Sequence, residues 1–213
     1  YEICACLVGS EMCIRDSLCD DNGMLVWAEI PFVGHGTDSP EFSENLKTQL
    51  TELIRQNYNH PSIFTWSLFN EIGFGDNPVV KPAGIVAELN DLAHAEDPSR
   101  PTIAATNRDD LPENWIPDYL AYNNYPGWYW AEPSAMGPSI DQKNKGRGVA
   151  VSEYGAGGSI DVHDQHVTVA PRPDGHYHPE EWQATVHEGT YSELAKRPYV
   201  WATWGWNLSL IHI

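Results

Sequence analysis

Short apolar runs rich in β-branched and aromatic residues alternate with stretches of helical periodicity along most of this chain. Such alternation is typical of folds in which helices join parallel strands, and it argues against a β-sandwich. The sequence predicts strands at residues 24–30, 63–69, 102–106, 119–123, 149–152 and 199–204. It predicts helices at residues 41–58, 82–95 and 179–196, and a long loop at residues 157–178. We therefore expect an α/β fold built on a parallel sheet.

The predicted helix at residues 41–58 has the clearest sequence signals for its start and for its buried face. Ser39 is a residue type that caps helices, and Pro40 is favoured in the first turn of a helix. Apolar residues follow at helical spacing and share one face, namely Phe42, Leu46, Leu50, Leu53 and Ile54. We expect this face to cover the sheet.

Length and charge narrow the possible functions. The chain has 213 residues, enough for one sizeable core but short of the roughly 250 residues of a complete eight-stranded α/β barrel. Its 12 basic and 30 acidic residues give a net charge of −18, which repels phosphate backbones and anionic membrane surfaces. No apolar run reaches the ~18 residues that a membrane span needs. We expect neither nucleic acid nor a membrane as a partner.

The aromatic content indicates a different kind of ligand. The chain contains nine Trp, ten Tyr and five Phe, many of them beside Gly, Asn or Pro where strands should end. Aromatic faces at strand ends suit flat, neutral ligands such as sugar rings.

The two ends of the chain do not share the pattern of its middle. Residues 1–17 show neither helical nor strand periodicity that persists. The strings CLVGSEMCIRDS and LSLIHI resemble translated sequencing-adapter read-through. We therefore expect residues 1–17 and 209–213 to be non-native, and native sequence to run from about Leu18 to Leu208.

Cysteines are concentrated in the first of these segments. The spacing of Cys4, Cys6 and Cys13, with no nearby histidine, argues against a zinc site. Cys19 then remains alone in the middle of the chain, which predicts no disulfide and leaves the cellular compartment open.

Two predicted strands each end in a glutamate directly after a continuous apolar run. They are SIFTWSLFNEIG, which contains Glu71, and GVAVSEYGAGG, which contains Glu153. A parallel strand is buried on both faces, so a carboxylate at its carboxyl end lies where barrel enzymes place catalytic groups. The alternative for either residue is a strand-end salt bridge. As a pair they fit a retaining glycosidase, whose acid/base and nucleophile have carboxyl groups about 5–5.5 Å apart.

The surrounding segments resemble glycoside hydrolase family 2, and within it the bacterial β-galactosidases. The resemblance rests on LCDDNGMLVWAEIP, NHPSIFTWSLFNE, YNNYPGWYW, VSEYGAGG, HPEEWQ and VWATWGWNL, which occur in the family's order. They resemble barrel strands three, four, six, seven and eight, and the likeness covers nearly all of residues 18–208. It implies an incomplete TIM (β/α)8 barrel of about strands three to eight.

The resemblance also implies roles for individual residues. Glu71 resembles the acid/base, and Glu153 the nucleophile that forms a covalent glycosyl-enzyme intermediate. Asn70 resembles the residue that hydrogen-bonds the sugar 2-hydroxyl. Tyr125 resembles the tyrosine that donates to the nucleophile and keeps it ionised. Trp206 resembles the tryptophan that forms the floor under the sugar.

Asn123 and Trp128 complete the predicted substrate-binding set. Asn123 lies in the same segment as Tyr125, and Trp128 and Tyr129 could extend the sugar platform. Packing in an exposed loop explains Trp128 and Tyr129 equally well. For Trp206 the alternative is a buried plug between strand and helix.

Neither a metal nor a cofactor is expected. Some β-galactosidases hold magnesium with a Glu-x-His sequence after the third strand, whereas this chain has Glu29, Ile30 and Pro31 there. A cluster of histidines in the predicted loop has no helical His pair or cysteine beside it. We therefore interpret these histidines as residues on the rim of the loop and not as metal ligands. Its members are His163, His166, His176 and His178.

The predicted function is hydrolysis of terminal β-D-galactosyl residues by double displacement, with a β-galactoside as the substrate. β-Glucuronidase and β-mannosidase stay open as alternatives, because these relatives share the acid, the nucleophile and the tyrosine. A noncatalytic carbohydrate-binding barrel predicts the loss of one glutamate, and both are present. The oligomeric state stays open.

The missing strands lead to expectations for the chain by itself. A barrel removes sheet edges only when it is closed, so the edges at residues 24–30 and 199–204 should be unpaired. Residues 1–17 should lack consistent packing against an open, C-shaped sheet that has Glu71 and Glu153 at one end. We expect the isolated chain to be poorly soluble and inactive.

Overall fold

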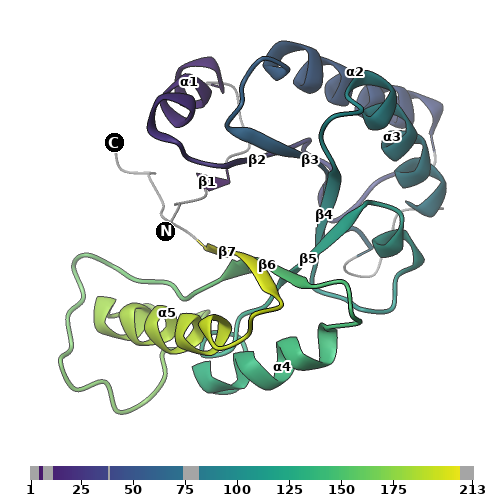
Figure 1. The fold of residues 1–213 in the computed structure, drawn as a ribbon. Coiled ribbons are helices and arrows are strands. Elements are labelled where there is room, and N and C mark those ends of the chain that lie inside the picture. Colours follow the sequence, from purple (N-terminus) through teal and green to yellow (C-terminus); the bar gives the residue numbers. More distant parts are fainter. Residues whose placement is uncertain (1–4, 7–11, 38, 74–81, 207–213) are drawn as a thin grey trace. The chain divides into compact units, whose positions relative to one another are not determined.

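The computed structural model describes residues 5–6, 12–37, 39–73 and 82–206. The chain divides into two compact units, Tyr1–Ala121 and Tyr122–Ile213. Figure 1 shows the order of their helices and strands, and each unit is described by itself.

The described part of the first unit contains parallel strands that are hydrogen-bonded in chain order. They are β1 (Ala5–Cys6), β2 (Val26–Glu29), β3 (Ile63–Asn70) and β4 (Thr102–Thr106). The helices between them are α1 (Met12–Asn22), α2 (Pro40–Asn57) and α3 (Pro82–Glu96). A short 3-10 helix, η1 (Pro112–Trp115), follows β4, and β5 (Tyr119–Asn123) crosses the boundary between the units.

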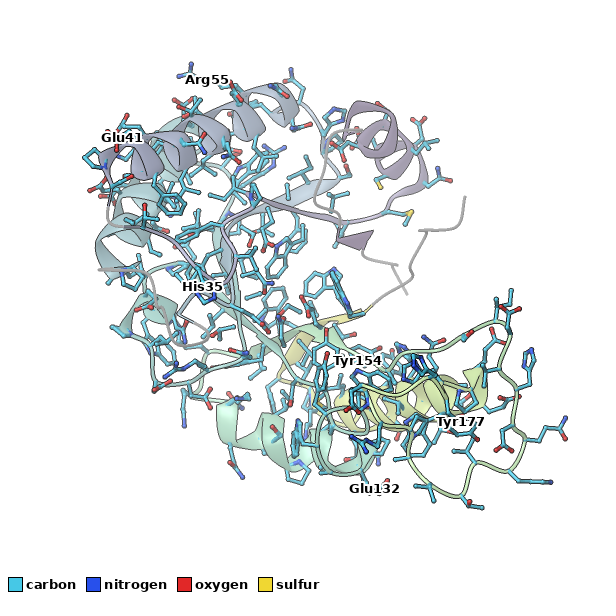
Figure 2. The ribbon with its side chains drawn as sticks, turned by 180° about the vertical axis from the view of Figure 1, so that it is seen from behind. His35, Glu41, Arg55, Glu132, Tyr154 and Tyr177 are labelled. Carbon is cyan, nitrogen blue, oxygen red and sulfur yellow. The ribbon has the colours of Figure 1, made fainter. Side chains whose placement is uncertain are left out.

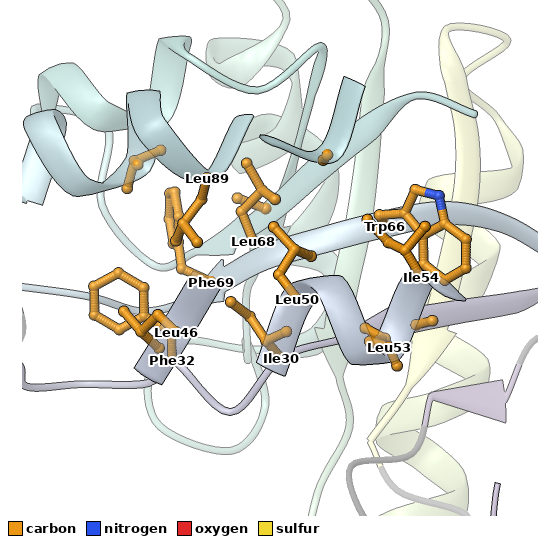
Figure 3. Packing of buried hydrophobic residues seen from close by; sticks show 14 of the residues in the cluster. Ile30, Phe32, Leu46, Leu50, Leu53, Ile54, Trp66, Leu68, Phe69 and Leu89 are labelled. Carbon is orange, nitrogen blue, oxygen red and sulfur yellow. The ribbon is translucent and has the colours of Figure 1, made fainter. Parts of the chain in front are cut away.

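The core of the first unit lies between these strands and the helices α2 and α3, which contact each other and β3. Figure 3 shows this packing around Ile30, Phe32, Leu46, Leu50, Leu53, Ile54, Trp66, Leu68, Phe69 and Leu89. Burial of each large aliphatic side chain stabilises the fold by about 1.5–3 kcal/mol. The predicted apolar face of α2 therefore holds this helix on the sheet.

Helix α2 begins where the sequence predicts. The Ser39 hydroxyl oxygen accepts a hydrogen bond from the backbone N–H of Phe42 at 3.1 Å, and Pro40 is the first helical residue. Glu41 in the first turn and Arg55 in the last complement the helix dipole, and both lie on the outer face in Figure 2. Arg55 also forms an ion pair with Glu96 of α3 at 2.6 Å.

The turn between α3 and β4 is fixed by a buried carboxylate. Asp97 accepts hydrogen bonds from the Trp66 indole at 3.0 Å, from Arg100 at 2.7 Å and from the Ser99 backbone N–H at 2.9 Å. Burial by itself would raise the pKa of Asp97, but these donors outweigh it and lower the pKa to about 2. The ionised carboxylate ties this turn to β3.

The second unit contains the parallel pair β6 (Val149–Tyr154) and β7 (Val200–Gly205). Its helices are the 3-10 helix η2 (Pro133–Ala135), α4 (Met136–Lys143) and α5 (Glu180–Ala195). Helix α5 contacts η2, α4 and β7. Arg197, just after α5, binds both carboxylate oxygens of Asp141 on α4, at 2.9 and 2.8 Å, which fastens the two helices together.

Most predicted elements are confirmed, with ends shifted by at most two residues. The predicted loop at residues 157–178 is also confirmed, with an isolated bridge between Ser159 and Pro179. None of the helices in the described ranges is both long and apolar enough to cross a membrane.

Two expectations about the elements were wrong, and one helix was missed. Residues 12–17 are helical, and Asp16 is buried, with its carbonyl accepting a hydrogen bond from the Ser62 hydroxyl at 3.4 Å. Strand β1 pairs with β2, Ala5 opposite Val26, so the edge at residues 24–30 is not unpaired. Helix α4 was not predicted at all. The non-native interpretation of residues 1–17 and 209–213 stays a prediction, and Leu208 lies outside the described residues.

Candidate active site

Glu71 lies at the carboxyl end of β3, as predicted. Asn70 is the last residue of the strand and Glu71 follows it directly, with both residues partly buried. The backbone N–H of Asn70 donates to the carbonyl of Phe32 at 2.9 Å, and the Asn70 carbonyl accepts from the N–H of Gly34 at 3.3 Å. The loop after β2 thus runs along the end of β3 and fixes the backbone of Asn70.

The backbone of Glu71 is in a left-handed conformation, with φ of 52°. A side chain other than glycine pays for this region with about 1–3 kcal/mol of strain, which persists only where the surroundings impose it. Here the N–H of Glu71 donates to the carbonyl of Ala105 on β4 at 2.9 Å, and Gly73 donates to Gly34 at 3.0 Å. Contacts on both sides therefore turn the chain sharply at Glu71.

An arginine supports this turn from the loop after β4. The Arg108 guanidinium donates to the carbonyl of Gly73 at 3.2 Å and binds both carboxylate oxygens of Asp110, at 3.0 and 2.8 Å. Asn114 of η1 donates to the Arg108 carbonyl at 2.8 Å. Sequence reasoning missed Arg108, since no motif singles it out.

In the second unit the structure brings together two predicted residues. Glu153 is the penultimate residue of β6, and Tyr125 follows the end of β5 by two residues. The Tyr125 hydroxyl donates a hydrogen bond to a carboxylate oxygen of Glu153. A donor of this kind stabilises the ionised form of a carboxylate.

The residues before Tyr125 bind the residues around Glu153. The side-chain amide oxygen of Asn123 accepts a hydrogen bond from the Ser152 hydroxyl at 2.6 Å, and both residues are buried. The backbone N–H of Asn124 donates to the carbonyl of Glu153 at 2.8 Å. Asn123 thus supports the frame of the site, and its predicted sugar contact stays a prediction.

Trp206 follows β7 directly and is 47% exposed, so it is not a buried plug. Its backbone N–H donates to the carbonyl of Tyr154 at 2.7 Å, which places it beside the end of the Glu153 strand. Gly155 has φ of 147°, and a Cβ there would come within 2.3 Å of the Trp206 carbonyl oxygen. Burial lowers the pKa of His187, whose ring lies against Tyr154 and Gly155.

The aromatic loop after Tyr125 divides into a packed and an exposed part. Trp128 packs against the buried cluster of Ala156, Trp182 and Val186, whereas Tyr129 is 67% exposed. Of the loop-rim histidines, His178 lies edge-on to the Trp128 ring with centroids 5.1 Å apart. His163 lies 3.4 Å from a carboxylate oxygen of Glu180.

Glu71 belongs to the first unit, and Glu153 and Trp206 to the second. The predicted separation of the two carboxyl groups stays a prediction. Within each unit, each glutamate lies at the carboxyl end of a parallel strand. Barrel enzymes use this end for catalysis.

Comparison with known proteins identifies the family. The family model for the glycosyl hydrolases family 2, TIM barrel domain, matches residues 15–166. The chain belongs to glycosyl hydrolase family 2. Its fold is accordingly part of a TIM barrel, and the prediction of an incomplete α/β barrel is confirmed.

Individual members of family 2 match over almost the whole chain. A β-glucuronidase from Bacteroides fragilis is 46% identical over 202 residues, which is 90% of this chain and 28% of the relative. A solved structure described as a putative β-galactosidase from Bacteroides fragilis has a TM-score of 0.82 and 32% identity over 96% of this chain and 30% of its own. An FMN-binding β-glucuronidase from Faecalibacterium prausnitzii has a TM-score of 0.84 and 32% identity, covering 95% and 31%. The chain thus spans under a third of these proteins.

The magnesium site of some family 2 members does not fit these residues. At the end of β2 the Glu29 carboxylate accepts hydrogen bonds from the Ser67 hydroxyl at 2.6 Å and the Trp27 indole at 3.2 Å. Burial raises the pKa of Glu29 and outweighs the two hydrogen-bond donors, which lower it. Pro31 stands where the resemblance to family 2 places the metal-binding histidine. In the described part of the chain, no group of three or more His, Cys, Asp or Glu residues is arranged to hold a metal.

Proposed function

We propose that this protein is a retaining β-glucuronidase, with Glu153 as the nucleophile and Glu71 as the acid/base. The observation that carries the proposal is the hydrogen bond from the Tyr125 hydroxyl to the Glu153 carboxylate. A carboxylate nucleophile must be ionised to attack, and this bond stabilises the ionised form. The strained backbone at Glu71 supports a functional role for that residue, because such strain is concentrated at active sites.

In the first step an oxygen of Glu153 attacks the anomeric carbon of the sugar. The bond from that carbon to the aglycone oxygen breaks, and the carboxylic acid of Glu71 gives its proton to the departing oxygen. Asn70 hydrogen-bonds the sugar 2-hydroxyl, and Trp206 lies under the ring. The step leaves a covalent glycosyl-enzyme and an ionised Glu71.

In the second step the Glu71 carboxylate takes a proton from water while the water oxygen attacks the anomeric carbon. The bond to Glu153 breaks and leaves its carboxylate free. The sugar departs with its original β configuration, and both glutamates return to their starting protonation states.

A glucuronide is proposed in preference to the galactoside that the sequence suggested. The relative with 46% identity is named a β-glucuronidase, and so is one of the two solved structures described above. A galactoside is the second candidate, because the other structure described above is a putative β-galactosidase. The presence of both glutamates favours an enzyme over a noncatalytic sugar-binding barrel.

Nitrophenyl β-glucuronide, β-galactoside and β-mannoside separate these candidates. They would be assayed with this chain and with a longer protein that contains it, each beside a Glu153→Gln control. We expect kcat/KM to favour the glucuronide by about 10⁴-fold, because a site built to bind a polar group strongly rejects an analogue that lacks it. A preference for the galactoside would overturn the proposed sugar. Turnover unaffected by Glu153→Gln would overturn the proposed nucleophile.

A further inference from the structure

We propose that Asn124 is a positioning residue, through which helix α4 sets the geometry of Tyr125 and Glu153. The inference rests on the proposed function, because it concerns the reactivity of the proposed nucleophile. Asn124 lies between Asn123, the last residue of β5, and Tyr125, and only 6% of it is exposed.

The side chain of Asn124 is anchored on the start of α4. Its amide nitrogen donates to the Ser139 hydroxyl oxygen at 3.0 Å and lies 3.3 Å from the sulfur of Met136. Met136 is completely buried, as is Ile140 one turn later, so the first turn of α4 is fixed in the core of the second unit. A buried amide held by two partners has little freedom to move.

The backbone of the same residue is bonded to the nucleophile strand. The N–H of Asn124 donates to the carbonyl of Glu153 at 2.8 Å. One residue earlier, the side-chain amide oxygen of Asn123 accepts a hydrogen bond from the Ser152 hydroxyl at 2.6 Å. Consecutive residues at the end of β5 therefore hold consecutive residues of β6, and Asn124 connects this pair to α4.

The other side of Tyr125 is also held. The Gly127 carbonyl accepts a hydrogen bond from the Trp182 indole of α5 at 3.0 Å. The φ of Gly127 is 87°, and a Cβ there would lie 2.8 Å from Pro133, so this position requires glycine. Tyr125 thus lies between one anchor on α4 and another on α5.

This arrangement gives Asn124 a role in positioning Tyr125, in addition to any contribution to the stability of the fold. If its side chain is removed, the first anchor is lost while Gly127 still holds the far end, so Tyr125 can move away from Glu153. The Tyr125 hydrogen bond stabilises ionised Glu153. Its weakening should therefore slow attack by Glu153 and move the acidic limb of the pH–activity profile to higher pH.

The test measures covalent labelling by a 2-fluoro glucuronide and a 2-fluoro galactoside with good leaving groups. It uses whichever form of the protein, this chain or a longer one that contains it, is labelled in the wild type. For Asn124→Ala we expect the maximal labelling rate to fall by about 10- to 100-fold, since displacement of a reacting group by about 1 Å costs up to that much. The reagent's dissociation constant should be unchanged, and the acidic limb should move to higher pH.

Two further comparisons separate positioning from loss of stability. Asn57→Ala is the matched control, because Asn57 is also a buried asparagine, bonded to the Leu53 carbonyl in the first unit at 2.8 Å. It should lower stability without changing the labelling rate. Ser139→Ala should act in the same direction as Asn124→Ala, Ser139→Thr should restore the rate, and the double alanine variant should be no slower than Asn124→Ala alone.

The outcomes distinguish the two proposals. A wild type labelled on Glu153, with an Asn124→Ala variant that keeps the wild-type rate and pH profile, would overturn the inference alone. If Asn124→Ala does not fold, equal rates for Ser139→Ala and Ser139→Thr would overturn it. A wild type that neither reagent labels on Glu153 would overturn the proposed function and this inference with it.

Discussion

At the scale of single residues, the backbone of Glu71 is the least expected feature of the chain. Its φ of 52° is one that glutamate rarely adopts, and hydrogen bonds with the neighbouring strand and loop hold it there. The loop after β4 adds Arg108 on Gly73. Several contacts hold this strained backbone in place. Such strain is typical of functional sites, where the direction of a side chain is favoured at the expense of local stability.

Glu71→Ala tests the assignment of this residue as the acid/base. The variant should lose about 10²- to 10⁴-fold in kcat/KM on glucuronides with poor leaving groups, because their departure requires a proton. It should lose much less on nitrophenyl glucuronide, whose aglycone leaves without protonation. The measurement is kcat/KM across aglycones of decreasing acidity.

Glu188→Ala serves as the matched control, since it removes a glutamate from α5 that has no proposed catalytic role. Its kcat/KM should not depend on the leaving group. Equal losses by Glu71→Ala on good and poor leaving groups would rule out the acid/base assignment.

Both glutamates could be predicted from sequence, because each follows an apolar run that reads as a buried parallel strand. The left-handed backbone of Glu71 could not, since it is imposed by residues far away in sequence. The same holds for Asn124, whose role depends on Ser139 and Met136 in a helix that the sequence did not predict.

At the scale of elements, the turn from α3 to β4 depends on the buried carboxylate of Asp97. Its pKa is lowered from an ordinary value of 3.8 to about 2. A carboxylate with a depressed pKa in the folded state stabilises the fold fully above its unfolded pKa, and loses that contribution as the pH falls through the folded pKa.

Asp97→Asn should therefore destabilise the fold by about 2 kcal/mol near neutral pH, and the difference from wild type should shrink as the pH falls from about 4 toward about 2. Denaturant unfolding at a series of pH values measures this difference. Asp174→Asn, which breaks an exposed pair with Arg172, is the control and should change stability by less than about 1 kcal/mol. A constant Asp97→Asn difference across this pH range would contradict the account.

Helices with strong signals could be predicted, and α4 could not. Gly137 and Pro138 lie in its first turn, and both residue types weigh against a helix in a sequence reading. Proline is tolerated there because the first N–H groups of a helix have no intrahelical partner. Burial of Met136 and Ile140, one turn apart, then stabilises the helix through tertiary packing. The segment at residues 12–17 was missed for a similar reason, since it lacks a persistent period yet buries Asp16.

At the scale of the whole molecule, the sequence identified the family and barrel fold but favoured a galactoside. By the resemblance, the proposed acid/base, nucleophile and tyrosine are shared by family members that act on different sugars, so these residues carry no information about the sugar. The chain spans 28–31% of the relatives and structures it matches. The activity of the whole protein is therefore a proposal. Identifying the residue that reacts with the sugar tests this proposal most directly.

The measurement that tests the central claim most directly is the identity of the residue labelled by a 2-fluoro glucuronide. The labelled protein would be digested and the modified peptide sequenced by mass spectrometry. The account predicts a single modification on the side chain of Glu153, absent from Glu153→Gln, because an amide cannot attack the anomeric carbon. A label on another residue, or one that persists in Glu153→Gln, would contradict it.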